Sequence, residues 1–322
     1  MKRREFITLL GGAAFVSLAA RAQEVGRTYR LGGLHLSPRN APWHVALFEE
    51  LRRSGFIEGQ NLFGDAHGYG MRAEQLPEHA SEIVRAQVDV ILCVGDAAIR
   101  AAQQATKTIP ILGLTDNMVA SGFVRSLGRP DGNTTGVSIL ASDLDGNRQE
   151  ILMEALPGVR RMAVLADPNT TSPQQLQALE EETHRRGGEL LIYRVTKPEE
   201  IAGAIDTASS SGASALNLLA TPLLFNNRQI ILQRAAALHL PTIFQAEGSE
   251  DGGLLAYGPR FVQLFRDIYA RQLIMLLRGT KPADIPVEQP TKFELVINLK
   301  TAKAIGVDVP PSLLLRADEI IE

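Results

Sequence analysis

The chain has little of what would cross-link it or hold it in a membrane. Its 322 residues include one cysteine, Cys93, which excludes an internal disulfide. Cys93 lies in the apolar run 88–94, so we expect a buried thiol and not a nucleophile. The only long apolar run, residues 7–20, has 14 residues, fewer than the roughly 20 that a transmembrane helix needs. The sequence therefore predicts a mature protein that is soluble.

The chain also lacks the excess of positive charge that nucleic-acid binding demands. It has 33 Lys and Arg against 36 Asp and Glu. Without residues 1–22, which carry four basic residues and one acid, the net charge falls from −3 to −6. We therefore expect no nucleic-acid partner.

Residues 1–22 have the three parts of a secretory signal peptide. Basic residues 2–4 come first, the apolar run follows, and small residues stand at positions 20 and 22. The pair Arg3-Arg4 also fits a twin-arginine export signal, with a plain Sec signal as the alternative. We expect export, a mature chain that begins at Gln23, and a periplasmic location.

After the signal, short apolar segments alternate with longer amphipathic ones. The expected strands are residues 29–34, 88–94, 109–114, 161–165, 189–194, 213–219 and 241–244. The expected helices are residues 42–54, 73–86, 97–105, 144–156, 172–186, 198–209 and 223–238. This alternation predicts an α/β fold with parallel sheets covered by helices on both faces. A chain of about 300 residues predicts two lobes, with residues 130–138 as the first crossing between them.

Motifs that would indicate an enzyme are absent from the sequence. There is no GxSxG elbow, no Walker loop, and no zinc spacing among the six histidines. Residues 68–73 match GxGxxA, but no buried strand precedes them, as dinucleotide binding requires. We expect no catalytic residue, no metal and no cofactor.

Polar residues instead follow the predicted strands, where the carboxyl ends of parallel strands line the ligand crevice of open α/β sheets. In the first half these residues are His35, Ser37, Gly95, Asp96, Ala97, Thr115 and Asp116. In the second half they are Asn169, Thr221, Gln245 and Glu247. Trp43 and Phe225 would add aromatic walls, or else pack within their helices.

Two of these residues carry charge. Asp96 either caps the N-terminus of the helix that follows it or, together with Asp116, holds a ligand ammonium group. Asp116 alone is equally well explained as a turn former. The sequence leaves these alternatives open.

Several segments resemble bacterial ABC-transporter substrate-binding proteins, the tryptophan/tyrosine-type periplasmic components. The longest is the C-terminal block formed by residues 279–298, 299–306 and 310–321. The runs GFIEGQN (55–61), SLGRPDGNTTGVS (126–138) and GGLLAYG (252–258) also match. The resemblance covers essentially the whole chain.

The resemblance implies a type I periplasmic-binding-protein fold, with two Rossmann-like lobes, three crossings and the ligand between the lobes. Lobe one would comprise residues 28–138 and 256–279, and lobe two residues 139–255 and 280–322, with Tyr257 at the hinge. Better-known relatives bind aromatic amino acids. The chain departs from them at Asp96, where relatives carry a small or hydroxyl residue, in the more polar loop 35–40, and in residues 64–70, which replace an ordinary strand.

The leading hypothesis is an exported receptor that closes two lobes on a small organic ligand, such as an aromatic amino acid or a related aromatic compound. It would act as a monomer and deliver the solute to the membrane permease of an ABC importer. The alternative is a periplasmic sensor that passes its bound state to a membrane signalling partner. An enzyme whose residues converge from distant segments is the third and least favoured hypothesis.

Overall fold

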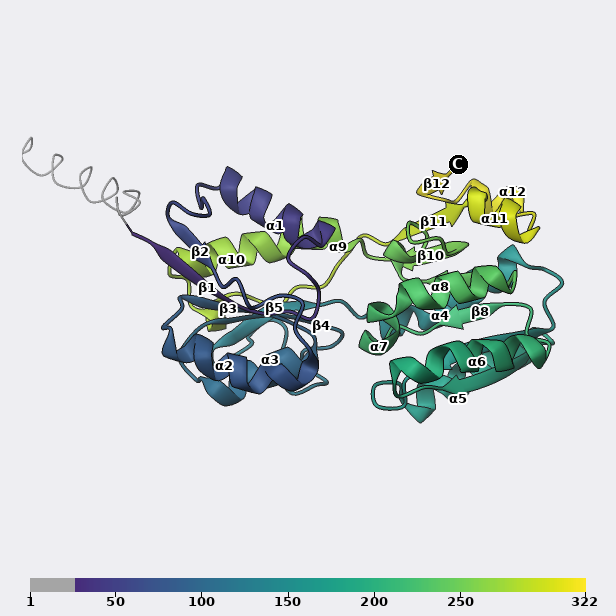
Figure 1. The fold of residues 1–322 in the computed structure, drawn as a ribbon, viewed down its shortest axis with the longest axis horizontal. Coiled ribbons are helices and arrows are strands. Elements are labelled where there is room, and N and C mark those ends of the chain that lie inside the picture. Colours follow the sequence, from purple (N-terminus) through teal and green to yellow (C-terminus); the bar gives the residue numbers. More distant parts are fainter. Residues whose placement is uncertain (1–26) are drawn as a thin grey trace, which may run out of the picture.

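Two α/β lobes lie side by side in the computed structural model, which describes residues 27–322 (Figure 1). The predicted signal peptide, residues 1–22, lies outside the described residues. None of the helices in residues 27–322 combines the length and the hydropathy that a membrane-spanning helix requires. The α/β class with two mainly parallel sheets agrees with the fold that the sequence predicts.

The first lobe is built on a five-stranded parallel sheet with strand order β2-β1-β3-β4-β5. Its strands are β1 (Tyr29–Leu34), β2 (Leu62–Gly64), β3 (Val90–Val94), β4 (Ile111–Thr115) and β5 (Thr134–Ser138). The central strands are almost entirely apolar because both faces of the sheet are covered. The edge strand β2 was not predicted, since three residues of which one is buried leave no apolar pattern.

Helices cover both faces of this sheet (Figure 1). One face packs against α1 (Pro42–Arg53), α9 (Phe261–Leu264), the π-helix Phe265–Tyr269 and α10 (Ala270–Leu277). The other packs against α2 (Leu76–Arg85), which follows the short 3₁₀ helix Ala73–Gln75, and α3 (Asp96–Ala105). Cys93 is buried on this second face, and burial raises the pKa of its thiol well above the usual value. An unreactive thiol follows, as expected from the sequence.

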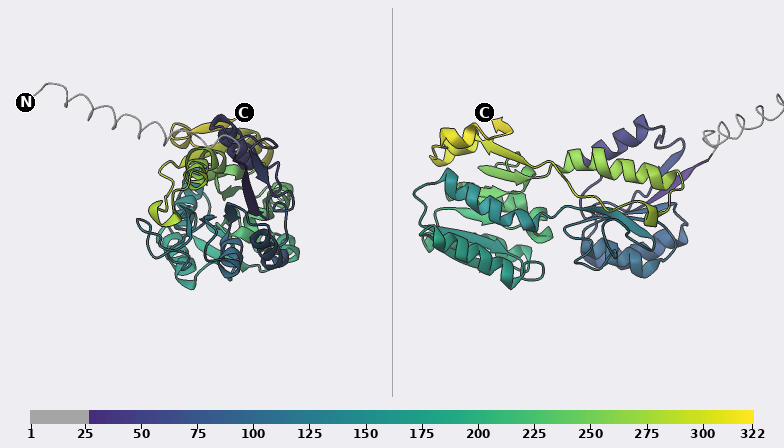
Figure 2. Two further views of the ribbon diagram at one scale, coloured as in Figure 1. Left: turned by 90° about the vertical axis from the view of Figure 1, so that its left-hand side faces the viewer. Right: turned by 180° about the vertical axis from the view of Figure 1, so that it is seen from behind.

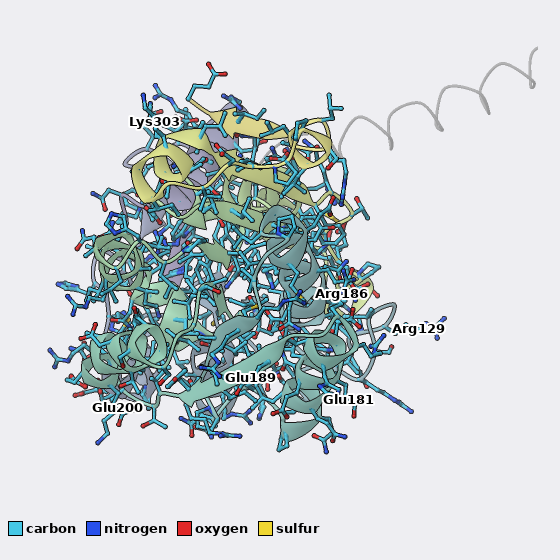
Figure 3. All side chains as sticks on the ribbon, turned by 90° about the vertical axis from the view of Figure 1, so that its right-hand side faces the viewer. Arg129, Glu181, Arg186, Glu189, Glu200 and Lys303 are labelled. Carbon is cyan, nitrogen blue, oxygen red and sulfur yellow. The ribbon has the colours of Figure 1, made fainter. Side chains whose placement is uncertain are left out.

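The second lobe is built on a seven-stranded sheet with order β12-β11-β10-β9-β8-β6-β7, parallel except between β10 and β11. Its strands are β6 (Arg161–Ala166), β7 (Glu189–Arg194), β8 (Leu216–Leu218), β9 (Thr242–Phe244), β10 (Leu255–Gly258), β11 (Glu294–Asn298) and β12 (Glu319–Ile321). Its helices are α4 (Asp145–Ala155), α5 (Pro173–Arg185), α6 (Pro198–Ser210), α7 (Pro222–Asn226), α8 (Arg228–Ala237), α11 (Leu299–Ile305) and α12 (Pro311–Leu314). Glu181, Glu200 and Lys303 lie on its outer surface, which mixes charges of both signs (Figure 3).

The chain passes between the lobes after β5, after β10 and before β11 (Figure 2). The predicted first crossing, residues 130–138, ends in β5, which pairs in register with β4, so the crossing begins later. The other boundaries move as well. Residues 256–258 belong to β10 in the second sheet, whereas Ile285, Val287 and Glu288 pack or bond against the first lobe.

One predicted helix, residues 223–238, is two helices. The hydroxyl of Thr221 caps α7 by accepting a hydrogen bond from the Leu224 amide at 3.2 Å. Asn227 leaves helical geometry with φ −108° and ψ 12°, and its side-chain amide donates to the Leu223 carbonyl at 2.8 Å. The break separates the short helix carrying Phe225 from the longer helix that packs on the sheet.

Candidate functional site

A cavity of about 220 Å³ lies between the two lobes. In the first lobe it is lined by Leu36, Ser37, Trp43, Leu76, Val94, Gly95, Asp96, Ala97, Ala98, Leu114, Thr115, Asp116, Ile139 and Ala141. Phe261 and Phe265 add to that side, and Ala220, Thr221, Pro222, Phe225, Asn226 and Gln245 line the other. Ten of the fourteen residues selected from the sequence therefore meet in one cavity.

Many of the first-lobe residues that line the cavity lie at or just after the carboxyl ends of β1, β3 and β4. Gly95, directly after β3, has φ 90°, a conformation that suits glycine, and it is the N-cap of α3. The backbone turns sharply there, so residues 95–98 lie against the cavity. In the second lobe, α7 starts four residues after the last residue of β8, and Gln245 directly follows β9, as the same strand-end rule predicts.

Aromatic rings from both lobes meet at the cavity. The ring centroids of Trp43 and Phe225 are 6.0 Å apart, those of Trp43 and Phe261 5.8 Å, and those of Phe225 and Phe261 5.1 Å. Trp43 comes from α1, Phe225 from α7 and Phe261 from α9. Phe261 and Phe265 were missed from the sequence, although their four-residue spacing on a helix is a signal for a shared face.

Asp96 and Asp116 also line the cavity, each held by hydroxyl groups. The hydroxyls of Thr115 and Ser121 donate to the two carboxylate oxygens of Asp96, the latter at 2.7 Å. The interpretation of Asp96 as the N-cap of α3 is wrong, because Gly95 holds that position and none of the described side chains caps it. Asp116 accepts from the backbone amide of Ser142 at 3.1 Å and from its hydroxyl. Asp116 thus holds Ser142, at the start of the first crossing, by two hydrogen bonds.

Four sequence-selected residues do not line the cavity. His35 is fully buried and its ring stacks on Tyr69, with centroids 4.7 Å apart and planes at 3°. Asn169 is exposed, and its backbone and side-chain amides both donate to the Asp167 carboxylate in the loop after β6. The structure thus turns both side chains away from the crevice.

Glu247 and Tyr257 do not line the cavity but bond to other residues of the site or of the crossings. Glu247 is buried and accepts a 2.6 Å hydrogen bond from the backbone amide of Phe261, so it positions a residue that does line the cavity. Burial raises the pKa of Glu247 to about 7. The Tyr257 ring packs near Phe293, and its backbone carbonyl accepts a hydrogen bond from Arg148.

Arg148 joins two of the crossings. Its guanidinium is fully buried and donates to the Ala141 carbonyl at 2.8 Å, to the Tyr257 carbonyl at 3.0 Å and to Asp145 at 2.6 Å. Asp145 in turn accepts from the amide of Ala220, which lines the cavity. Burial raises the pKa of Asp145 to about 6 despite the adjacent guanidinium. The pair therefore connects the hinge to the cavity wall by direct bonds.

Behind the first lobe's side of the cavity, His35 and His44 form a buried pair. Their ring centroids are 4.7 Å apart, and His44 Nδ1 bonds to the Pro38 carbonyl at 2.9 Å. Among the residues that the structure describes, His44 Nε2 and both ring nitrogens of His35 have no hydrogen-bond partner. Burial lowers the pKa of His44 to about 4, and burial, with smaller contributions from His44 and Arg39, lowers the pKa of His35 well below its usual value. Both rings are neutral at pH 7.

Acid is expected to destabilise the protein through His44. Unfolded histidine binds a proton below about pH 6.5, whereas folded His44 does so only near pH 4, so its stabilisation exists above 6.5 and is lost as pH falls toward 4. The free energy of unfolding of the wild type should therefore fall between about pH 7.5 and pH 5. His44→Gln should make that fall smaller by about 2 kcal/mol. Urea unfolding at both pH values measures it. The exposed His184→Gln should behave as wild type; equal pH dependence for all three proteins would contradict the assignment.

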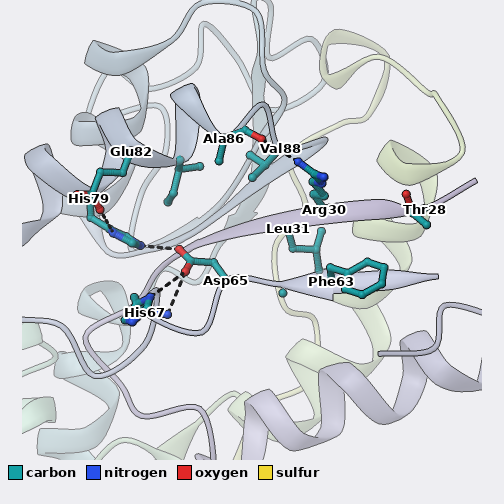
Figure 4. A pocket seen from close by; sticks show the side chains of 12 residues that line it. Thr28, Arg30, Leu31, Phe63, Asp65, His67, His79, Glu82, Ala86 and Val88 are labelled. Carbon is teal, nitrogen blue, oxygen red and sulfur yellow. Dashed lines mark hydrogen bonds and ion pairs between the residues drawn. The ribbon is translucent and has the colours of Figure 1, made fainter. Parts of the chain in front are cut away.

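A second groove lies on the first lobe alone, between β1, β2 and α2 (Figure 4). His79 is held there between Asp65, at 2.5 Å, and Glu82, at 3.0 Å. These side chains satisfy one another, and the second lobe contributes nothing. Among the described residues, no group of three or more His, Cys, Asp or Glu side chains is placed to hold a metal ion. The interlobe cavity is the stronger candidate site.

Comparison with known proteins gives a consistent family. A family model described as ABC transporter substrate binding protein matches residues 47–321. A tyrosine-binding protein from Clostridioides difficile is 26% identical over 263 residues, which cover 80% of this chain and 74% of the relative.

Two solved structures share the fold. A conserved domain protein from Vibrio cholerae matches with a TM-score of 0.80 at 22% identity, over 91% of this chain and 100% of its own. An ABC domain from Streptococcus pneumoniae in complex with L-Trp matches with a TM-score of 0.78 at 20% identity, with the same coverage. At these identities the likeness speaks for the fold.

Proposed function

Because the family model spans residues 47–321, the chain belongs to the ABC transporter substrate-binding proteins, and we propose that it binds an aromatic amino acid or a related aromatic compound between its lobes. The family consists of solute-binding proteins and not of enzymes. The observation that carries the proposal is the cavity whose aromatic lining comes from both lobes. The relatives described as tyrosine-binding and as an L-Trp complex support the same ligand class.

The proposed mechanism is closure of the lobes about the hinge. A ligand that contacts both lobes stabilises the closed form by the difference between its contacts in the closed and open forms. Trp43 of the first lobe and Phe225 of the second pack against each other at the cavity wall, so a ring bound against them touches both lobes. Ser37, Gly95, Asp96, Ala97, Thr115, Asp116, Thr221 and Gln245 would supply its polar contacts.

We further propose that the protein works in the periplasm as a monomer. It would deliver its solute to the membrane permease of an ABC importer. The family match and the signal-like residues 1–22 support this arrangement.

Binding should appear as thermal stabilisation of the chain from Gln23. At a ligand concentration about 100 times Kd, linkage stabilises the folded state by about 2.7 kcal/mol, which raises Tm by about 5 °C or more. We expect this shift with L-tryptophan, L-tyrosine or L-phenylalanine and not with L-alanine or L-glutamate. Phe225→Ala should weaken binding about 10-fold or more, whereas Phe63→Ala, on an exposed edge strand, should not. No shift with any aromatic amino acid or related aromatic compound would refute the proposed ligand class.

A further inference from the structure

The ionisable side chains that line the cavity are both acidic. Asp96 and Asp116 are the two, and no Lys, Arg or His side chain of the described residues joins them in the lining. The buried guanidinium of Arg148 bonds to Asp145 and to the backbone carbonyls of Ala141 and Tyr257 at the crossings. A ligand in the cavity therefore meets negative charge without a compensating cation.

Neither carboxylate is neutralised by its own partners. Asp96 accepts from the hydroxyls of Thr115 and Ser121, and Asp116 from the amide and hydroxyl of Ser142. These are neutral donors, and each carboxylate oxygen can accept more than the one bond just named. The bonds fix the carboxylates in place while leaving both their charge and accepting positions for a ligand. A primary ammonium group, with three donors and a positive charge, matches this arrangement.

The start of α3 is where a ligand carboxylate would otherwise be received, because helix N-termini attract anions. Here Asp96 is the first residue of that helix and its carboxylate lies beside the cavity. A second carboxylate brought by the ligand would be repelled by Asp96 and would find no cationic partner. The cavity thus favours the amine end of an amino acid and disfavours its acid end.

On these grounds we infer that the cavity selects arylalkylamines, the decarboxylated counterparts of aromatic amino acids, over the amino acids themselves. The aromatic rings of Trp43, Phe225 and Phe261 take the ring of the ligand, and Asp96 and Asp116 take its ammonium group. The inference rests on the proposed function, whose aromatic ligand it specifies. The cavity discriminates against the amino acid because its lining has no cation to pair with the amino acid's carboxylate, whereas the amine brings no carboxylate.

Isothermal titration with matched probes tests the selection. The probes are tryptamine, L-tryptophan and indole-3-propionate, and tyramine, L-tyrosine and 4-hydroxyphenylpropionate. We expect at least one amine to bind about 10-fold or more tightly than its amino acid, and neither deaminated acid to bind. An amino acid that binds as tightly as its amine, or a deaminated acid that binds, overturns the inference while leaving the proposed function intact. Absence of binding by all six overturns both.

Substitutions of the two aspartates test whether their negative charges bind the ammonium group of the ligand. Asp96→Asn and Asp116→Asn keep the shape of the side chain and should weaken tryptamine about 10-fold or more. Tryptophol, which replaces the ammonium group by a hydroxyl, should change by no more than about twofold in the same variants. If a variant loses equal affinity for tryptamine and for tryptophol, the substituted aspartate has a structural role only, and the assignment is overturned. Asp143→Asn, an exposed acid next to Ser142 that does not line the cavity, is the matched control.

Discussion

Arg148→Met is expected to lower the free energy of unfolding by about 3–5 kcal/mol, because it leaves a buried carboxylate without its cation. Asp145 is 1% exposed and would keep only the Gln175 side chain and the Ala220 amide as donors. The carbonyls of Ala141 and Tyr257 would lose their donor as well. Methionine fills much of the arginine stem's volume, so the loss reports charge and hydrogen bonding more than an empty space.

Urea unfolding at pH 7 measures this effect, and Arg316→Met is the control. Arg316 forms an ion pair at 2.6 Å with Glu154, which lies on α4 as Arg148 does. The Arg316 side chain is 56% exposed. An exposed ion pair contributes at most about 1 kcal/mol, so the control should lose no more than that. The double variant Arg148→Met, Asp145→Asn should recover part of the stability, since it removes the unpaired charge. Similar losses for Arg148→Met and the control would contradict the role of the buried pair.

Gly136→Ala is expected to prevent stable folding or to cost about 4 kcal/mol or more. Gly136 lies in β5 with φ +147°, opposite Gly113 of β4, and an added Cβ would stand 1.7 Å from the Gly113 carbonyl oxygen. Backbone atoms in a paired strand cannot move aside without breaking the ladder. The contact cannot be relieved by a side-chain rotation.

Two other glycines make this prediction specific. At Gly113 an added Cβ meets the side chains of Ile99 and Met118, which can shift, so Gly113→Ala should cost less than Gly136→Ala. At Gly128 an added Cβ would have no atom of the described residues within 4 Å beyond its chain neighbours, and Gly128→Ala should change stability by no more than about 0.5 kcal/mol. Soluble yield and thermal melting of the three variants establish the order. A folded Gly136→Ala as stable as Gly128→Ala would refute the steric argument.

Local patterns were sufficient for most of the fold. The apolar run around Cys93 became a central strand, and Ser172 followed by Pro173 became a capped helix start, with the Ser172 hydroxyl accepting from the Gln175 amide at 3.1 Å. Such features depend on neighbours in sequence, which a pattern records. The break at Asn227 depends on a side-chain bond to the preceding turn, and the pattern of apolar residues continues through it.

The position of the interlobe cavity could be predicted from the sequence, but the direction of every side chain near it could not. The strand-end rule brought Thr115 and Gln245 to the cavity, because it depends on the topology of parallel sheets. It gives no side-chain direction, so it could not foresee that His35 stacks on Tyr69 or that Glu247 bonds to the backbone of Phe261. Those directions are set by partners far away in sequence.

The first lobe is completed by residues that are translated long after its strands. Tyr269, within the π-helix between α9 and α10, packs in the core of the first sheet, and its hydroxyl donates to the Leu112 carbonyl at 2.8 Å. Ile285 and Glu288 bond to β5 from still farther along the chain. During synthesis, strands β1 to β5 therefore emerge first, but one face of their sheet is covered by α1 alone until the strands of the second lobe from β6 to β10 have followed. The first lobe is complete only after β10, and the second only once β11 and β12 have followed, so neither lobe is finished before most of the chain has been made.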